Sequence, residues 1–592
     1  MPRQLIIPNP SSHDIASYNI LIDGAELNNS YQLQHLSIFM ETNRIPAAKI
    51  VLRDGEAAVR AFQISDTEEL IPGKKIEIKI GLDGDNTRVF AGIITKHSVK
   101  VKANGNTQLE LECKDEFIKL ATGRKSRYFE NMRDDELVSE IIGKYQGLSS
   151  ETDETTYVNK EIVQHNITDW DFILLRAEAN GMLININAGK LSLKKPATSE
   201  VPVLQVNYGS SIIEFEAEMD AKPQWQRVKA MAWNYQNQEL ADATTEGISS
   251  FRENGNLEGT TLSRAIGLNE YSLRHSGFKT GAELQAWADA VMLKSRMSKI
   301  KGRVKVTGFG NIFPGDMLEI TGIGNRFNGN AMVSAVQHDM GTGDWETNIQ
   351  FGIDNCNYIF QHDNINDSPA AGLTGGIQGL QIGVVAQLEN DPGGEDRILV
   401  RLPAIDANGK GIWSRVCTLD AGNNRGSFFR PEIGDEVIVG FINSDPNQAI
   451  VMGMLNSSAK PAPLVAKDNN HEKGIFTRSK MRLLFNDDTN TITIDTPAGN
   501  KIKIDEQSSR IEVKDSSNNE IILSTGGIKL SSPLNVDIEA GVNLSLKAGA
   551  MLSIGGTSLG ISADGNINIS GAKAALSANG ITEIKGSLVK IN

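Results

Sequence analysis

The C-terminal part of the chain carries a regular pattern of apolar and polar positions. Apolar residues occur in pairs two positions apart, and successive pairs begin 8, 8, 7 and 8 residues after one another. A spacing of two places both members of a pair on one face of a β-strand. The pairs are Val536/Ile538, Leu544/Leu546, Leu552/Ile554, Leu559/Ile561 and Ile567/Ile569. We expect these ten residues to form the core of a ladder of short strands.

The same part of the chain lacks large rings. From residue 486 to residue 592 there is no Phe, Tyr, Trp, Cys or His, although aromatic rings usually supply much of a core's buried area. This absence predicts a narrow interior. Eight extended residues span at most about 26 Å, so one octad forms one side of a prism. Either one chain coils with three octads per turn, or three chains each contribute one octad per layer. The second arrangement needs no lateral cap and leaves no open sheet edge, so we favour it.

The first 365 residues alternate in the manner of strands, for example in AAKIVLRDG, KKIEIKIGLDG and QLELECKDEF. Helical periodicity is expected over 134–145, 168–180 and 280–297. Thr168 and Thr280 are suitable N-cap residues, and Gly181 is a suitable stop for the second helix. Helices set among antiparallel-type strands predict an α+β region of mainly β structure over 1–365.

Four further segments are expected after residue 365. Residues 366–381 and 457–480 are rich in small, polar and Pro residues and are predicted linkers. Between them, 382–456 contains five strand-like runs, IGVVAQL, RILVRLP, IWSRVCTL, DEVIVGFI and AIVMGML. Five strands in so few residues favour a small closed barrel. Residues 481–592 are the predicted needle that contains the octads.

Composition narrows the class of partner. The formal net charge of −14 argues against a nucleic-acid partner, since such a partner attracts a basic surface. The opening MPRQLIIPNPSSHD does not resemble a secretory signal, and no run of roughly 18 apolar residues indicates a membrane-spanning helix. Cys113, Cys356 and Cys417 are far apart, and we expect buried, reduced thiols.

Motifs that suggest chemistry lack their required context. Gly556-Thr-Ser558-Leu-Gly560 matches a nucleophile elbow, which needs a strand-to-helix turn with a His and an acid nearby. Ser558 lies between two octads in a segment without histidine, so we interpret the motif as structural. His471-Glu472 lacks the second His of a zinc motif. We therefore expect no catalytic residue, no cofactor-binding residue and no metal ligand.

Four other stretches have ordinary structural interpretations. The glycine-rich GFGNIFPG and GIGNRFNG fit no phosphate-binding loop and are predicted turns between strands. The acidic run 134–136 opens a predicted helix, where carboxylates interact favourably with the helix dipole. Phe428, Phe429 and Arg430 in the barrel could bind a nucleic acid or a sugar, but we favour a contact between subunits.

Stretches along nearly the whole length of the chain resemble a known protein family. LIPGKKIEIKIG, RVFAGIITKH, HNITDWDFILLRAEANGMLI and GNIFPGDMLEITGIGNRFNGNAMVSAVQHDM in the first region resemble the VgrG-type spike proteins of type VI secretion and of phage-tail-like contractile injection systems. FRPEIGDEVIVGFINSDPNQAIVMGML is similar to their oligosaccharide/oligonucleotide-binding (OB) barrel, and KGIFTRSKMRLLF begins a stretch similar to the start of their needle. The resemblance implies a phage-tail-hub-like α+β region, an OB-type β-barrel and an intertwined trimeric triangular β-helix.

The resemblance also implies function and partners. We expect a non-enzymatic homotrimer that caps an inner-tube ring protein, contacts baseplate proteins, carries a small PAAR-like tip protein and meets the target membrane transiently. Effector cargo is a further expected partner. We expect synthesis in the bacterial cytoplasm without a signal peptide, then assembly into an injection particle and ejection or release to the exterior.

The chain departs from some relatives. The stretch between barrel and needle is too short for the lysozyme domain of the T-even phage needle protein. We also expect no effector domain after the octads and no His-x-His iron site at the tip, since the last histidine is His471. The alternative is a β-helical tail spike, adhesin or carbohydrate-active protein that binds surface polysaccharide. It would need paired carboxylates or exposed aromatic residues on the needle.

Overall fold

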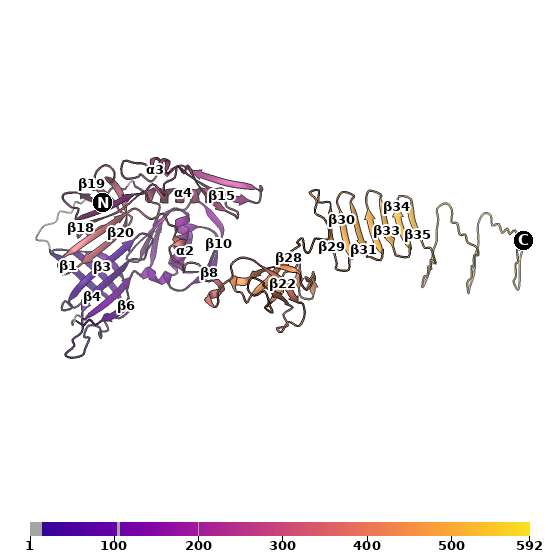
Figure 1. The fold of residues 1–592 in the computed structure, drawn as a ribbon, viewed down its shortest axis with the longest axis horizontal. Helices are drawn as coiled ribbons and strands as arrows, with labels where there is room; N and C mark the ends of the chain where they lie inside the picture. Colours follow the sequence, from indigo (N-terminus) through magenta and orange to yellow (C-terminus); the bar gives the residue numbers. More distant parts are fainter. Residues whose placement is uncertain (1–14, 104–106, 199, 342, 592) are drawn as a thin grey trace. The chain divides into compact units, whose positions relative to one another are not determined.

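The computed structural model describes residues 15–103, 107–198, 200–341 and 343–591. The chain divides into two compact units, one up to Met454 and one from Leu455. In the first unit, the largest sheet has thirteen strands and lies in residues 15–365, the region that we call the hub (Figure 1). In spatial order it contains β14 (Glu214–Met219), β18 (Ile300–Thr307), β21 (Trp345–Phe351), β20 (Gly329–Met340), β3 (Leu33–Glu41), β4 (Ala47–Arg53), β7 (Gln108–Lys114), β6 (Asp85–Lys100), β5 (Lys75–Leu82), β1 (Ala16–Ile22) and β2 (Ala25–Glu26), with β19 (Met317–Thr321) beside β20 and β13 (Leu204–Asn207) beside β19.

Helices pack against smaller sheets of the hub. The two-stranded sheet contains β8 (Lys125–Arg133) and β10 (Val158–Ile167), and a three-stranded sheet contains β11 (Leu183–Asn187), β12 (Lys190–Lys194) and β9 (Ser149–Thr152). Around them lie η1 (Glu116–Ala121), α1 (Asp134–Gly143), α2 (Asp169–Ala179) and η2 (Tyr358–Phe360). A further sheet contains β16 (Glu239–Thr245), β15 (Arg227–Asn234) and β17 (Glu270–His275), with α3 (Gly259–Ile266) and α4 (Gly281–Met297) nearby in the sequence.

The three predicted helices are confirmed. The Thr168 hydroxyl accepts from the backbone N–H of Asp171, and Thr280 and Glu283 form a complete capping box at α4. Gly181 follows α2 with φ +64°, and a Cβ there would approach Ala290 Cα to 2.9 Å. Glycine therefore both ends α2 and permits close packing on α4. The sequence does not predict helix α3, because the helix is short and begins with Gly-Thr-Thr, three residues of low helix propensity.

The expected five-stranded barrel is also confirmed. It is closed in the order β22 (Gln381–Gln387), β23 (Ile398–Arg401), β24 (Ile412–Val416), β28 (Ala449–Met454) and β27 (Glu436–Phe441). Its interior is filled by alternating aliphatic side chains such as Val400, Val437, Val439 and Val451. The connections contain η3 (Pro369–Gly372), a small hairpin of β25 (Ala421–Gly422) and β26 (Arg425–Gly426), and η4 (Ile442–Ser444).

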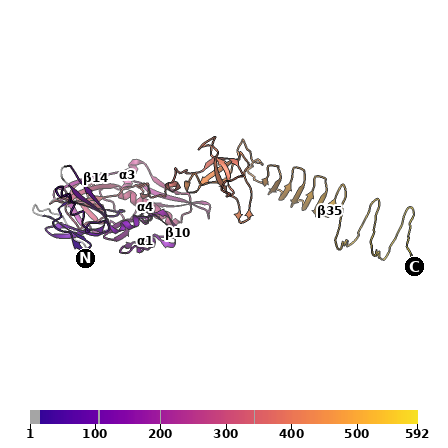
Figure 2. The same ribbon diagram turned by 90° about the horizontal axis from the view of Figure 1, so that it is seen from below.

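The second unit contains one antiparallel sheet, whose seven strands follow one another in sequence (Figure 1). They are β29 (Glu472–Phe476), β30 (Arg482–Asn486), β31 (Thr491–Asp495), β32 (Lys501–Asp505), β33 (Arg510–Lys514), β34 (Glu520–Ser524) and β35 (Gly527–Ser531). Beyond β35 the chain continues in open undulations (Figure 2). In its described part, residues 533–591, no strand is assigned. The region predicted as one needle thus contains two different kinds of structure.

One expectation about the cysteines is wrong. Cys113 is buried as expected, and burial raises the pKa of its thiol to about 12. Cys356 and Cys417 are exposed instead. Both lie outside regular strands and helices, where alternation gives no guide to burial.

Candidate assembly surface

The strands β31 to β35 place their aliphatic side chains on one face of the sheet. Strand alternation puts two such residues from each strand on that face. The antiparallel register then aligns them in two rows that cross all five strands: Ile492, Ile504, Ile511, Leu523 and Ile528 in one row, and Ile494, Ile502, Val513, Ile521 and Leu530 in the other. We call these ten residues the aliphatic face.

The aliphatic face is uncovered in the single chain. Its side chains are between 37% and 78% exposed. Soluble monomers rarely expose a contiguous apolar patch of this kind, because each buried CH₂ group contributes about 0.8 kcal/mol. The face therefore has the character of an interaction surface.

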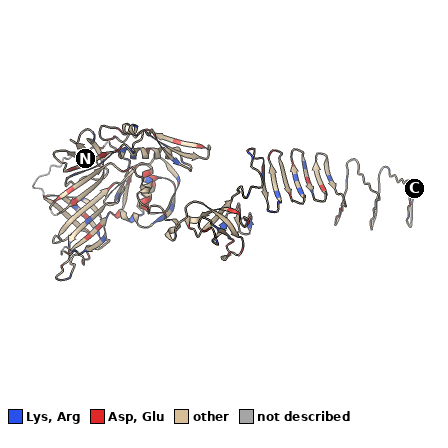
Figure 3. Cartoon of the chain, viewed as in Figure 1, with Lys and Arg blue, Asp and Glu red and all other residues tan. Residues whose placement is uncertain are grey.

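Charged residues alternate with the aliphatic ones along these strands, so they lie on the opposite face of the sheet. Figure 3 marks the charged positions along the chain. Ion pairs join Arg482 to Asp495 at 2.7 Å, Lys503 to Asp505 at 2.7 Å, and Arg510 to Glu520 at 3.4 Å. The hydrogen bond from Arg482 lowers the pKa of Asp495, and the one from Lys503 lowers the pKa of Asp505 to about 2. One face of the sheet is thus suited to water and the other to a dry contact.

The ten predicted core residues of the octads lie beyond this sheet. They are Val536, Ile538, Leu544, Leu546, Leu552, Ile554, Leu559, Ile561, Ile567 and Ile569, and each is between 47% and 79% exposed. The described part of their segment has no backbone–backbone hydrogen bond. A single chain does not bring the ten together, and their role as a core stays a prediction.

The sequence prediction of site residues left out the aliphatic face. The signal was present, since Ile521/Leu523 and Ile528/Leu530 show the same spacing of two as the octad pairs. The turns between these strands vary in length, so the repeat was less regular than in the octads. Strand β29 lies within the stretch predicted as the linker 457–480.

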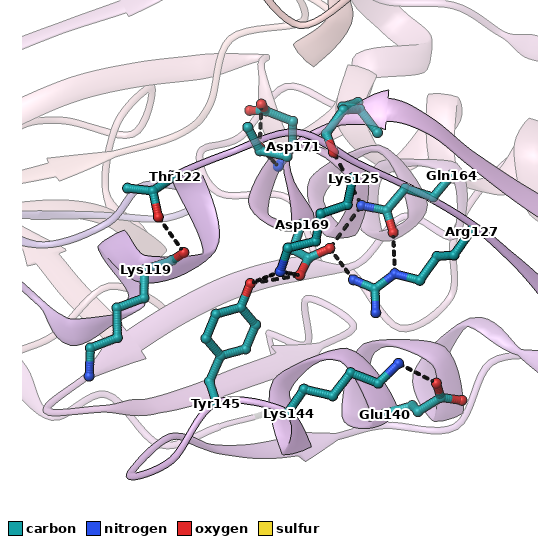
Figure 4. A network of polar contacts seen from close by, with 12 residues as sticks. Lys119, Thr122, Lys125, Arg127, Glu140, Lys144, Tyr145, Gln164, Asp169 and Asp171 are labelled. Carbon is teal, nitrogen blue, oxygen red and sulfur yellow. Dashed lines mark hydrogen bonds and ion pairs between the residues drawn. The ribbon is translucent and has the colours of Figure 1, made fainter.

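The buried carboxylate of Asp169 lies at the centre of a network of polar contacts in the hub (Figure 4). Asp169 accepts hydrogen bonds from Lys125 at 2.8 Å, Tyr145 at 2.7 Å and Gln164 at 2.8 Å, and it pairs with Arg127. Burial alone would raise the pKa of Asp169, but these donors lower it to about 2. Because the donors already occupy both carboxylate oxygens, the network joins β8, β10 and α2 and offers no reactive group.

A cleft of about 1050 Å³ in the hub is lined by charges that neutralise one another. Arg44 pairs with Glu41 at 3.0 Å, Lys294 pairs with Glu178, and Lys301 pairs with Asp354 at 2.7 Å. Among the described residues, no group of three or more His, Cys, Asp and Glu side chains is placed to hold a metal ion. In that same part of the chain, no helix has the length and apolarity required to span a membrane.

The glycine-rich stretches and the acidic run fall where the sequence suggested, and the subunit contact at Phe428, Phe429 and Arg430 stays a prediction. GFGNIFPG and GIGNRFNG connect β18 to β19 and β19 to β20, and the acidic run begins α1. Asp134 does more than face the helix dipole, since it forms a bidentate pair with Arg176 at 2.7 and 2.8 Å. Phe428 is 77% exposed, and the Arg430 guanidinium lies 5.2 Å from its ring centre. Ser558 is exposed in the segment without strands or helices.

Comparison with known proteins decides the family. Residues 12–342, more than half of the chain, match the family model described as the Alg8 N-terminal domain. The chain belongs to this family. Residues 381–455 of this Alg8 N-terminal domain protein match a second model, the type VI secretion system/phage-baseplate injector OB domain, which covers the closed barrel.

Curated relatives of this family member are spike proteins. It is 37% identical to the type VI secretion system spike protein VgrG1a of Pseudomonas aeruginosa over 67 residues. These residues make up 11% of this chain and 10% of the relative. It is 33% identical over 75 residues to VgrG3 of Vibrio cholerae, 13% of this chain and 7% of the relative. The expected similarity to VgrG-type spike proteins is confirmed, although the matches span only a tenth or less of these relatives.

Solved structures of tail proteins are similar at low sequence identity. A tail protein from Neisseria meningitidis MC58 is 13% identical with a TM-score of 0.42, covering 57% of this chain and 96% of that one. The E. coli c3393 protein, a type VI secretion component, is 10% identical with a TM-score of 0.39, covering 74% and 99%. At such TM-scores the family assignment depends on the sequence matches.

Proposed function

We propose that this chain is the hub-spike of a contractile injection system and works as a homotrimer. The observation that carries the proposal is the aliphatic face, a two-row apolar surface that the single chain leaves uncovered, in a protein whose barrel matches an injector OB domain. Three copies of the sheet would turn these faces toward one axis and leave the ion-paired faces in water. That arrangement removes the apolar surface from solvent without requiring another protein.

The mechanism of this hub-spike is mechanical. Contraction of a sheath drives the tube forward, and a narrow needle with an aliphatic core concentrates the force on its tip. In such a needle every backbone group is paired between strands, so it can enter a bilayer without exposing unsatisfied N–H and C=O groups. The octad residues from Val536 to Ile569 form its dry interior.

In the proposed role this chain has no enzymatic activity. Asp169, a buried carboxylate of the hub, already accepts hydrogen bonds on both oxygens, and Ser558 has no strand-to-helix turn around it. Purified protein should not hydrolyse peptidoglycan, esters or nucleic acid. Turnover that disappears in Ser558→Ala would overturn this part of the proposal.

The partners follow from the same role. The hub caps an inner-tube ring protein and contacts baseplate proteins, the tip carries a small PAAR-like protein, and effector cargo travels with the spike. The chain is made in the bacterial cytoplasm and leaves the cell within the particle or on its release.

Removal of the gene from the producing bacterium tests this function. Electron micrographs should then show no complete contractile particles, and the wild-type gene should restore them. Unchanged particles with full injection activity would contradict the proposal. Retention of particles together with loss of binding to surface polysaccharide would favour the tail-spike or adhesin alternative.

A further inference from the structure

The second unit contains one segment that completes its backbone pairing and one that does not. From β29 to β35, each strand pairs with its neighbour in sequence, for example Thr491–Asp495 with Lys501–Asp505. Short turns such as 496–500 close these hairpins with their own hydrogen bonds. Contacts between close neighbours in sequence form fast and need no second chain. The sheet is therefore a local structure of one chain, with one face left to be covered.

The octad segment does not complete its backbone pairing within one chain. Residues 533–591 have no strand and no backbone–backbone hydrogen bond, and successive undulations of the chain stand apart in both views (Figures 1 and 2). Backbone N–H and C=O groups that become buried must find partners. A strand of this segment can find them only on another strand, and its own chain supplies none. Its strands therefore depend on other chains.

From this contrast we propose that the aliphatic face is a self-sufficient trimerisation surface and that the octads fold only on the trimer it forms. The partner is two further copies of this chain. The inference rests on the proposed trimer and adds to it an order of assembly. The sheets associate first, and the octads then pair between chains from residue 532 toward the C-terminus.

The pattern of the chain argues for copies of itself as the occupant. The apolar pairs of the sheet, Ile528/Leu530 last, lead directly into the octad pairs, Val536/Ile538 first. The spacing of apolar pairs thus continues along the sequence from a surface that is already formed into a segment that needs other chains. This part of the sequence contains no aromatic ring beyond Phe485, which suits a position where three identical faces meet at one axis.

Association of the sheets also removes the main obstacle to folding of the octads. Ordering one residue costs about 1–2 kcal/mol of conformational entropy, and three separate octad segments would have to meet in register while doing so. Three joined sheets hold the three chains together at Ser531. The next octads are then at high effective concentration, and each layer formed places the following one.

Two charge substitutions in the full-length chain separate the two stages. Leu552→Asp breaks the octads, and Ile494→Asp breaks the aliphatic face. We expect Leu552→Asp to remain trimeric by light scattering, with tryptic cleavage at Lys547 and Lys573 faster by at least about tenfold. Ile494→Asp should be monomeric and equally sensitive at both lysines. All six tryptophans precede residue 455, so their fluorescence reports whether the hub stays folded in each variant.

Thr493→Asp is the matched control for the sheet. Thr493 neighbours Ile494 but lies on the charged face, directly opposite Lys503, so this variant should remain a trypsin-resistant trimer. A monomeric Leu552→Asp beside a trimeric wild type would overturn the order of assembly, as would a trimeric Ile494→Asp with protected octads. A monomeric wild type would instead defeat the proposed function, and with it this inference.

Discussion

The large hub sheet and the C-terminal sheet use the same alternation of side chains with opposite results. In the hub, Ile38 and Ile78 are fully buried, because the alternating strands pack their aliphatic residues into one core. In the C-terminal sheet, Ile494 and Ile502 remain about half exposed. The two regions also place their charges differently. The hub surrounds buried Asp169 with donors, whereas the sheet keeps its ion pairs on an outer face.

This difference shows which regions of the molecule bury their aliphatic residues within a single chain. The large sheet of the hub packs its aliphatic residues into a core of its own, so its stability should be a property of the chain. The C-terminal unit satisfies its charges but leaves its aliphatic residues uncovered, so its stability should depend on association. Substitutions in the two regions should accordingly have different consequences.

The largest effect is expected in the octads. Leu552→Asp would place three carboxylates close together in a narrow dry core, and a buried unpaired charge costs several kcal/mol even after relaxation. In the proposed trimer this cost would arise in each of the three chains, so the needle should lose its resistance to heat and detergent. Ser553→Asp, on the adjacent outward position, should change stability by less than about 0.5 kcal/mol. Equal tolerance of both substitutions would show that the octad register is wrong.

A smaller loss of folding stability is expected from a substitution in the hub. Asp169→Asn removes the charge that pairs with Lys125 and Arg127. It should lower the free energy of unfolding of the hub by about 3 kcal/mol, the lower end for a broken buried pair, because both cations remain partly exposed. Denaturant titration followed by the fluorescence of the six tryptophans, among them Trp170 beside Asp169, measures this loss. The trimer should persist, and dissociation of Asp169→Asn into monomers would contradict the independence of the two regions.

The same carboxylate predicts a pH dependence of the hub. Its pKa of about 2 in the folded protein lies below the ordinary value of 3.8. The stability that its charge contributes is therefore present well above pH 4 and is lost as the pH falls through about 2. Acid titration followed by tryptophan fluorescence, to which Trp170 beside Asp169 contributes, should show this step in the wild type. Its retention in Asp169→Asn would assign the step to another group.

The smallest effect is expected on the charged face of the sheet. Arg482→Ala removes an exposed pair with Asp495, which is worth about 0–1 kcal/mol and is screened by salt. The variant should form trimers with unchanged trypsin resistance at 150 mM salt, an ionic strength with a Debye length of about 8 Å. A loss of trypsin resistance as large as that expected for Leu552→Asp would mean that the chains associate through the charged face and not through the aliphatic face.

Local patterns predicted much of this fold. The caps at Thr168 and Thr280 located two helices, and alternation located the barrel strands, because these signals act over a few neighbouring residues. Helix α3 gave no such signal, since its opening residues disfavour a helix. The networks of Asp134 and Asp169 could not be predicted, because Arg176 and Lys125 reach them from elements distant in sequence. The aliphatic face was visible as spacing, but only the strand register aligned it into two rows.

The mass of the purified full-length protein shows whether the chain assembles into a trimer. Light scattering at physiological salt should give about three times the 64.3 kDa of one chain, and this mass should persist on dilution, as expected for obligate association. A stable species of one chain mass, with the C-terminal sheet intact by circular dichroism, would contradict the account. It would mean that the aliphatic face stays in water or folds against its own chain.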